Sequence, residues 1–332
     1  MAHMNAGLES SGAPESLEGA KTPPLVAIIP ATSQVGRATI ESLLAHHPDK
    51  VRIRAAARSL SQSDELRSFQ NLEIIEGVDA FLRETHEAAF RGVERCFIVA
   101  PKLENRVEAV NLLMGSAQRC GVKHVVLIGG VFQEDEVCVM HQHWQATKRH
   151  AQVLGLKWTQ LQCVDFMENV LQHKITIASE SRMYGTGRGG RSPAVAVHDI
   201  GAAAASVLAC DDDRHFDRSY RIVGPAAIGP DNMAAAFSNV LGRQVQFVDY
   251  GLEKWRQDAL SLKKMPEWQV RGFYDWLRLY FLTGKLADVK SDLPLLGVQP
   301  TRFEDWLRAR SSLFEGADET AAVARQKELV LS

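Results

Sequence analysis

The sequence has few cysteines and no close pair of them. The 332 residues include five, at positions 96, 120, 138, 163 and 210, and none of them forms a Cys-x-x-Cys spacing. An odd number of widely spaced cysteines argues against a disulfide framework and favours reduced thiols. We therefore expect a cytoplasmic protein.

Long apolar runs and an excess of basic residues are also missing. No stretch approaches the roughly 20 apolar residues that a membrane-spanning helix needs, and residues 1–22 lack the apolar segment of a signal peptide. Lysine and arginine total 38 against 40 aspartates and glutamates, for a net charge of −2. This balance lacks the electrostatic footprint of a nucleic-acid-binding protein. We expect neither a membrane nor a direct nucleic-acid partner.

A metal site is not expected either. Histidines at 141, 143 and 150 lie near Cys138, but His141 and His143 do not share a face of a helix. No tight ligand pair such as His-Glu-x-x-His occurs.

The order of apolar segments predicts an α/β fold. Residues 25–29 form a continuous apolar run typical of a strand buried on both faces. Further strands are predicted at 51–57, 72–75, 96–100, 125–128 and 159–162, and helices at 37–46, 80–91, 107–120, 142–154 and 197–208. Such alternation indicates βαβ units and a doubly wound parallel sheet of Rossmann type.

The composition divides the chain into four parts. Residues 1–22 are rich in Ser, Gly, Glu and Pro and are expected to be disordered. Residues 23–219 carry the strand–helix alternation of a nucleotide-binding domain. Residues 220–314 contain more aromatic residues and predict a smaller, mostly helical lobe for a substrate or partner, and 315–332 predict a tail.

The first strand-to-helix turn carries the main functional signal. It reads Pro30-Ala-Thr-Ser-Gln-Val-Gly36 and stands where a helix N-terminus would hold a pyrophosphate. Pro30 lacks an N–H group, and Ser33 places a side chain where backbone would otherwise approach a phosphate. The Ser33 hydroxyl could donate to that phosphate. Either the turn binds a nucleotide, which we favour, or it is a Rossmann-like turn that has lost this function. The predicted contacts are Thr32, Ser33, Gln34, Val35 and Gly36.

The end of the second strand favours NADP(H) over NAD(H). Arg58 follows that strand, and no Asp or Glu occurs between Val51 and Ser63. NAD sites place an acidic residue here for the ribose diol, whereas an arginine suits a 2′-phosphate. The alternative is a solvated arginine at a strand end.

Several later segments resemble the NmrA-like family, which belongs to the atypical short-chain dehydrogenases and includes redox-sensing regulators and NAD(P)H-dependent quinone reductases. These relatives have Gly-Ala-Thr-Gly-x-x-Gly at the first turn, of which Ala31, Thr32 and Gly36 are kept. The segments that carry the resemblance lie in order between 25 and 314: Phe90–Pro101, Gly121–Val126, Gly155–Thr159, Phe166–Asn169, Val197–Gly201 and Pro300–Trp306.

The resemblance implies roles for particular residues. Ala100 and Pro101, at the end of the fourth strand, would border the path of the cofactor. Phe166 and Asn169 would line the nicotinamide end, with Met167 in the substrate cleft beside them. In a reading from the residues alone, Phe166 and Met167 belong to the core and Asn169 caps a helix.

The chain departs from its relatives at the catalytic positions. Trp144 stands where the reducing relatives carry a lysine, and Lys148 follows one helical turn later, the candidate to replace it. Gly129 and Gly130 stand after the fifth strand, where typical short-chain dehydrogenases have a catalytic serine. Gly129 would then border the cofactor, and Gly130 and Trp144 the substrate cleft. Trp144 could plug the cleft or stack on a ring.

Two functions remain open from the sequence. A nucleotide or redox sensor without the usual catalytic residues is favoured, acting through a protein partner. The alternative is an NADPH-dependent reductase of quinones or similar small flat acceptors, since the cofactor itself carries the hydride chemistry. The sequence names neither a substrate nor a partner.

Overall fold

The structure is a computed structural model that describes residues 22–59, 64–132, 134, 137–263 and 265–315. Apart from residues 22 and 315, the predicted disordered segment and tail lie outside the described residues. None of the helices in the described part is both long enough and apolar enough to cross a membrane.

A seven-stranded parallel sheet forms the centre of the molecule. Its strand order is β3-β2-β1-β4-β5-β6-β8, and every neighbouring pair runs parallel. The order reverses direction between β1 and β4, which confirms the predicted doubly wound sheet. The strands are β1 (Leu25–Ile29), β2 (Arg52–Ala56), β3 (Leu72–Ile75), β4 (Arg95–Ile98), β5 (His124–Gly130), β6 (Lys157–Cys163) and β8 (Arg218–Ile222).

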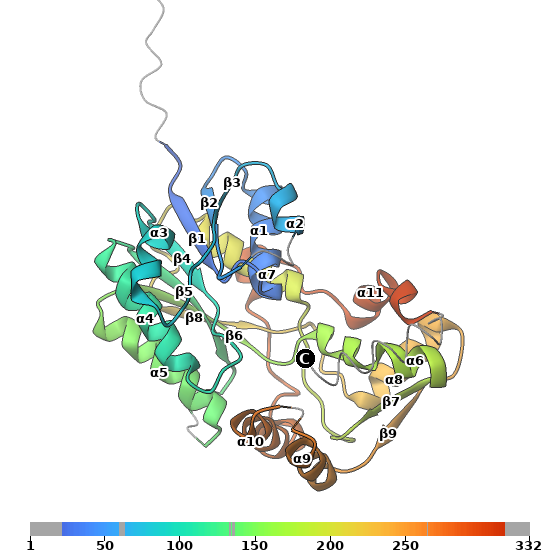
Figure 1. The fold of residues 1–332 in the computed structure, drawn as a ribbon. Helices are drawn as coiled ribbons and strands as arrows, with labels where there is room; N and C mark the ends of the chain where they lie inside the picture. Colours follow the sequence, from blue (N-terminus) through green and yellow to red (C-terminus); the bar gives the residue numbers. More distant parts are fainter. Residues whose placement is uncertain (1–21, 60–63, 133, 135–136, 264, 316–332) are drawn as a thin grey trace, which may run out of the picture.

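Helices cover both faces of this sheet (Figure 1). One face carries α1 (Gln34–His46) and α7 (Val197–Leu208), and the other α3 (His86–Phe90), α4 (Arg106–Arg119) and α5 (Val139–Val153). All five residues of β1 are buried between the two layers, as its apolar run predicts. The short α2 (Asp64–Ser68) and the 3₁₀ turn η1 (Arg83–Thr85) complete this part.

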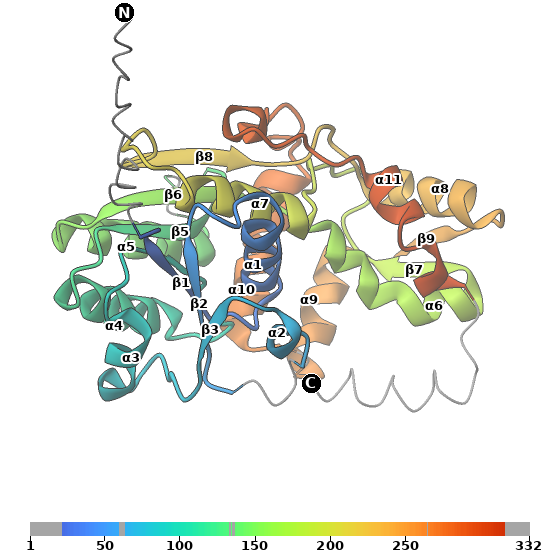
Figure 2. The ribbon, with the colours of Figure 1, turned by 90° about the horizontal axis from the view of Figure 1, so that it is seen from above.

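A smaller lobe lies beside the sheet (Figure 2). It contains a two-stranded parallel sheet with its own apolar core. Its elements are η2 (Met167–His173), α6 (Lys174–Glu180), β7 (Arg182–Gly185), α8 (Pro230–Leu241), β9 (Gln246–Asp249), α11 (Phe303–Arg308) and η5 (Ser311–Phe314). The predicted boundary at 219/220 falls inside β8, and the lobe also draws on residues 167–185 before it. Because β8 pairs with β6, residues 218–222 belong to the main sheet.

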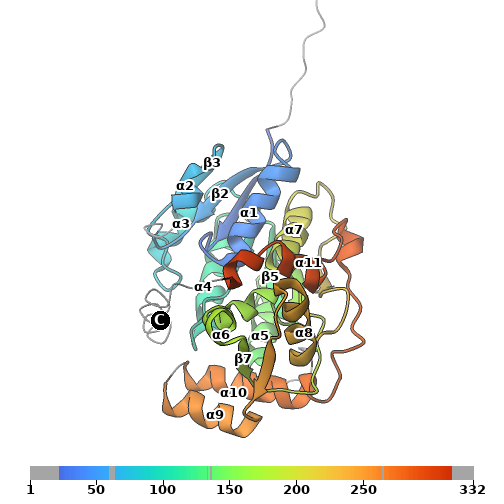
Figure 3. The same cartoon turned by 90° about the vertical axis from the view of Figure 1, so that its right-hand side faces the viewer.

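A pair of helices lies outside α5, with the second helix packed on α5 and the first packed on the second (Figure 3). These are α9 (Leu252–Ser261) and α10 (Glu267–Trp276), and α10 continues into the π-helical turn η3 (Leu277–Phe281). The Cys138 thiol donates to the carbonyl of Gly272, 3.4 Å away, and Met140 and Trp268 lie in one apolar cluster. The 3₁₀ turn η4 (Leu293–Leu296) packs on α7.

Three of the segments that carry the family resemblance hold one another in place. Glu168 accepts hydrogen bonds from the Trp306 indole N–H at 2.9 Å and from the Val197 backbone N–H at 3.0 Å. The buried Asp199 accepts from both the backbone N–H and the hydroxyl of Thr301, at 2.8 and 2.9 Å. These residues therefore join α7, η2 and the chain leading into α11.

Candidate functional site

The first strand-to-helix turn supplies the N-cap of α1 from its own residues. Ser33 caps the helix: its hydroxyl accepts from the Gly36 N–H at 3.0 Å and donates to the Pro30 carbonyl at 2.9 Å. A Cβ at Gly36 would lie 2.5 Å from that same carbonyl oxygen, so a larger residue does not fit. The Ser33 hydroxyl is thus engaged inside the turn. Gln34 is exposed at the start of the helix and Val35 is buried in the core.

An open cleft of about 770 Å³ lies at the carboxyl ends of β1, β2 and β4. We call it the edge cleft. Three of the predicted site residues line it, Thr32, Arg58 and Pro101. It is the place where ligands bind in open parallel sheets, outside the carboxyl ends of strands at the reversal of strand order.

The edge cleft is rich in positive charge. Arg37, Arg58 and Lys102 line it, against the single carboxylate of Asp79, which accepts from the Phe81 N–H at 2.9 Å. Sequence reasoning found Arg58 but missed Arg37 and Lys102. Each directly follows a predicted contact, Gly36 and Pro101, which is the signal that could have found them.

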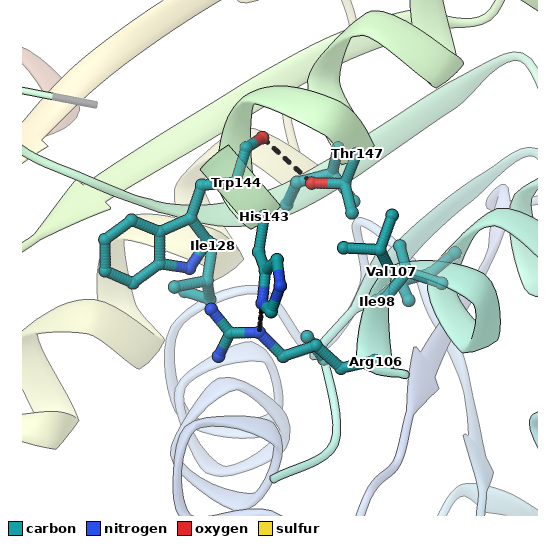
Figure 4. A pocket seen from close by; sticks show the side chains of 10 residues that line it. Ile98, Arg106, Val107, Ile128, His143, Trp144 and Thr147 are labelled. Carbon is teal, nitrogen blue, oxygen red and sulfur yellow. Dashed lines mark hydrogen bonds between the residues drawn. The ribbon is translucent and has the colours of Figure 1, made fainter. Parts of the chain in front are cut away.

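A second, almost filled pocket lies between α4, α5 and the ends of β4 and β5. Its free space is about 10 Å³, roughly that of one water, and Ala100, Arg106, His143 and Trp144 are among its lining residues (Figure 4). Trp144 packs on Gly130, where a Cβ would lie 2.5 Å from indole Cε3.

Arg106 places a buried positive charge in this pocket. Its Nε donates to His143 Nδ1 at 3.1 Å, and its guanidinium carbon lies 5.7 Å from the Trp144 ring centre and 5.1 Å from that of Trp268. Burial lowers the pKa of Arg106 to about 10, and burial followed by the Arg106 charge lowers the pKa of His143. We call Arg106, His143, Trp144 and Trp268 the indole cluster. Neither Arg106 nor Trp268 was predicted from the sequence as a site residue.

The structure places the other predicted site residues outside both pockets. Phe166 packs on the sheet core, Met167 is buried in the core of the small lobe and Asn169 is exposed on η2. Gly129 is buried, and a Cβ there would lie 2.6 Å from the Gln160 side chain. Their suggested roles stay predictions.

Lys148 lies one turn further along α5 than Trp144. Its Nζ donates to Glu134 Oε1 at 3.2 Å and lies 5.7 Å from the ring centre of Trp158. Trp158 belongs to the first part of β6, away from the carboxyl edge of the sheet. Lys148 therefore lines neither of the two pockets.

The sequence contains one Tyr-x-x-x-Lys spacing, that of the catalytic tyrosine and lysine of typical short-chain dehydrogenases, but it lies in a different part of the fold. Tyr250 precedes α9 and Lys254 lies on it, ion-paired with Asp258 at 2.8 Å. Neither lines the two pockets. In the described part of the chain no group of three His, Cys, Asp or Glu side chains is arranged to hold a metal ion.

The fold and its edge cleft define the class of NAD(P)-binding Rossmann proteins. The profile of the NmrA-like family matches residues 22–280, and the chain belongs to this family.

Similar proteins include both enzymes and a regulator. The NAD(P)H azoreductase of Xenophilus azovorans is 27% identical over 299 residues, covering 88% of this chain and all of the relative. An NADPH-dependent quinone oxidoreductase from Escherichia coli has a similar structure, with a TM-score of 0.74 and 20% identity over 86% of this chain and 99% of that one. The negative transcriptional regulator NmrA, in complex with NADP, gives a TM-score of 0.71 and 16% identity over 90% and 99%.

Proposed function

We propose that this protein binds NADP(H) in the edge cleft and uses it to reduce a small, flat aromatic acceptor. The observation that carries the proposal is the set of three cations, Arg37, Arg58 and Lys102, around a cleft at the reversal of strand order. Its volume of about 770 Å³ lies in the range of ligand sites in proteins.

The residues present fit a dinucleotide phosphate. Arg58 and Arg37 would hold the 2′-phosphate through charge-assisted hydrogen bonds, and Lys102 adds a third positive charge. The N-terminus of α1 would hold the pyrophosphate through backbone N–H groups, because the Ser33 hydroxyl is already bonded within the turn. Thr32 lines the same cleft.

Sequence similarity to an enzyme supports a reductase over a sensor. The azoreductase is matched over its full length and over 88% of this chain. A bound nicotinamide cofactor supplies the hydride, so the chain's own task is to bind, orient and exclude water. This task does not require the serine and tyrosine of typical short-chain dehydrogenases.

One observation favours the sensor as a second candidate. Trp144 and the rest of the indole cluster leave about 10 Å³ free in the second pocket, too little for an aromatic substrate. A protein that binds NADP(H) without turnover, and changes the surface that it presents to a protein partner, would need no such space.

Two measurements decide between these functions. We expect calorimetric titration to give micromolar binding of NADPH and NADP and weaker binding of NADH. We then expect NADPH oxidation, followed by its absorbance, with quinones and azo dyes as acceptors. Binding without turnover across the panel would favour the sensor, and an absence of any nucleotide binding would contradict both functions.

A further inference from the structure

Two buried hydrogen-bond donors in the indole cluster have no acceptor. Nη2 of Arg106 and Nε1 of Trp268 are both buried, and neither has a hydrogen-bond partner among the described residues. Trp268 is only 7% exposed, and its ring centre lies 5.1 Å from the Arg106 guanidinium carbon. Buried donors are normally satisfied, so two unsatisfied donors in one cluster are informative.

The charge of Arg106 is also without an anion. A buried guanidinium is costly unless it is paired with a carboxylate or another anion. No acidic side chain in the described part of the chain pairs with Arg106, whose guanidinium donates instead to the neutral ring nitrogen of His143. Arg106 is moreover the first residue of the 14-residue helix α4, whose N-terminus adds positive potential.

We infer that the indole cluster is a recognition site for a small aromatic anion, an aryl carboxylate or aryl sulfonate. Its anionic group would accept from Arg106 and Trp268, and its ring would stack on the indole of Trp144. If the proposed reductase function holds, this anion is its substrate class, so that reading of the site rests on the proposed function.

Binding requires the cluster to open. About 10 Å³ is free in the pocket, too little for an aromatic ring. The helix α10, which carries Trp268, packs on the start of α5 through contacts of Gly272 with Cys138 and Met140. Trp144 is supported from the other side by the backbone of Gly130. Because Trp268 approaches Arg106 from α10, movement of α10 relative to α5 would admit a ligand between these two side chains and change the surroundings of Trp268.

The test compares 2-naphthoate with its neutral counterpart 2-naphthamide on the full chain. Binding is followed by tryptophan fluorescence and by calorimetry, with and without saturating NADP. We expect wild type to bind the anion at least about tenfold more tightly than the amide. Arg106→Gln removes this preference, whereas the matched control Arg83→Gln, at an exposed arginine of η1, retains it.

Three results would overturn the inference. The first is equal affinity for the anion and the amide, and the second is unchanged anion binding in Arg106→Gln. The third is mutual exclusion of 2-naphthoate and NADP, which would mean that Arg106 belongs to the cofactor site. Melting temperatures show that each variant is folded. Failure of NADPH to bind while 2-naphthoate binding persists would refute the proposed function and leave the anion site standing.

Discussion

The indole of Trp144 lies directly against the backbone of Gly130, with no room for a side chain between them. Gly130 ends β5 and Trp144 belongs to α5, so this contact fixes the distance between the helix and the carboxyl edge of the sheet. Gly130 has no side chain, which is what allows so large a ring to fit beside the strand.

Gly130→Ala is expected to destabilise the protein. The added Cβ would overlap the six-membered ring of Trp144, and overpacking of this kind costs about 1–3 kcal/mol. Thermal and urea unfolding measure the loss. Because a smaller side chain leaves room for the methyl group, the double variant Gly130→Ala/Trp144→Leu should lose less than the sum of the two single variants. Strictly additive losses would show that the two residues do not interact as described.

Arg58→Glu should weaken binding of NADP(H) much more than binding of NAD(H). The glutamate removes a cation from the edge cleft and repels a 2′-phosphate, which NAD lacks. Calorimetric titration with both cofactors gives the ratio of affinities. Arg52→Glu is the matched control, because Arg52 is an exposed arginine at the opposite end of the same strand. Equal loss for both cofactors, or none, would refute the assignment of Arg58.

Gly201→Ala is expected to push α7 away from α1. The Cβ would lie 2.6 Å from both the Cβ and the carbonyl oxygen of Ala38, and backbone cannot yield as a flexible side chain can. We expect a loss of about 1–3 kcal/mol in the free energy of unfolding. Gly115→Ala on α4 serves as control: its nearest neighbour is the flexible end of Arg119 at 3.6 Å. That control should gain about 0.5–1 kcal/mol from helix propensity, so destabilisation of both variants alike would contradict the packing argument.

Asp165 should make stability depend on pH. It follows β6, accepts from the Ser192 hydroxyl at 2.6 Å, and burial raises its pKa to about 6 from an ordinary 3.8. A raised pKa means that the folded state binds the proton more tightly than the unfolded state, so stability falls as pH rises from about 4 to about 6 and then levels off.

Asp165→Asn removes this titration. The variant should gain stability relative to wild type as pH rises through the same range, while the two unfold alike near pH 4. Urea midpoints across the range measure the difference, with Asp213→Asn at an exposed aspartate as control. A constant difference between the two curves would mean that Asp165 does not titrate in this range.

The sequence by itself was enough for the fold. Continuous apolar runs such as 25–29 can only be buried on both faces, and their alternation with helical periods leaves a doubly wound parallel sheet. It also placed Thr32, Arg58 and Pro101 at one cleft, because the carboxyl ends of parallel strands share an edge. The sequence did not predict the short elements. These are the 3₁₀ and helical turns at 83–90 and the small strands β7 and β9, whose patterns are too short to detect.

Only the tertiary structure decided which side chains meet in the indole cluster. The pattern of α5 places Trp144 and Lys148 on the same side of one helix, but packing against Gly130 keeps the first at the carboxyl edge, and Trp158 and Glu134 hold the second. The approach of Arg106 to Trp268 joins residues far apart in the chain. Such contacts depend on how helices dock on the sheet, which no linear spacing specifies, because side chains meet through their volumes and not through their order.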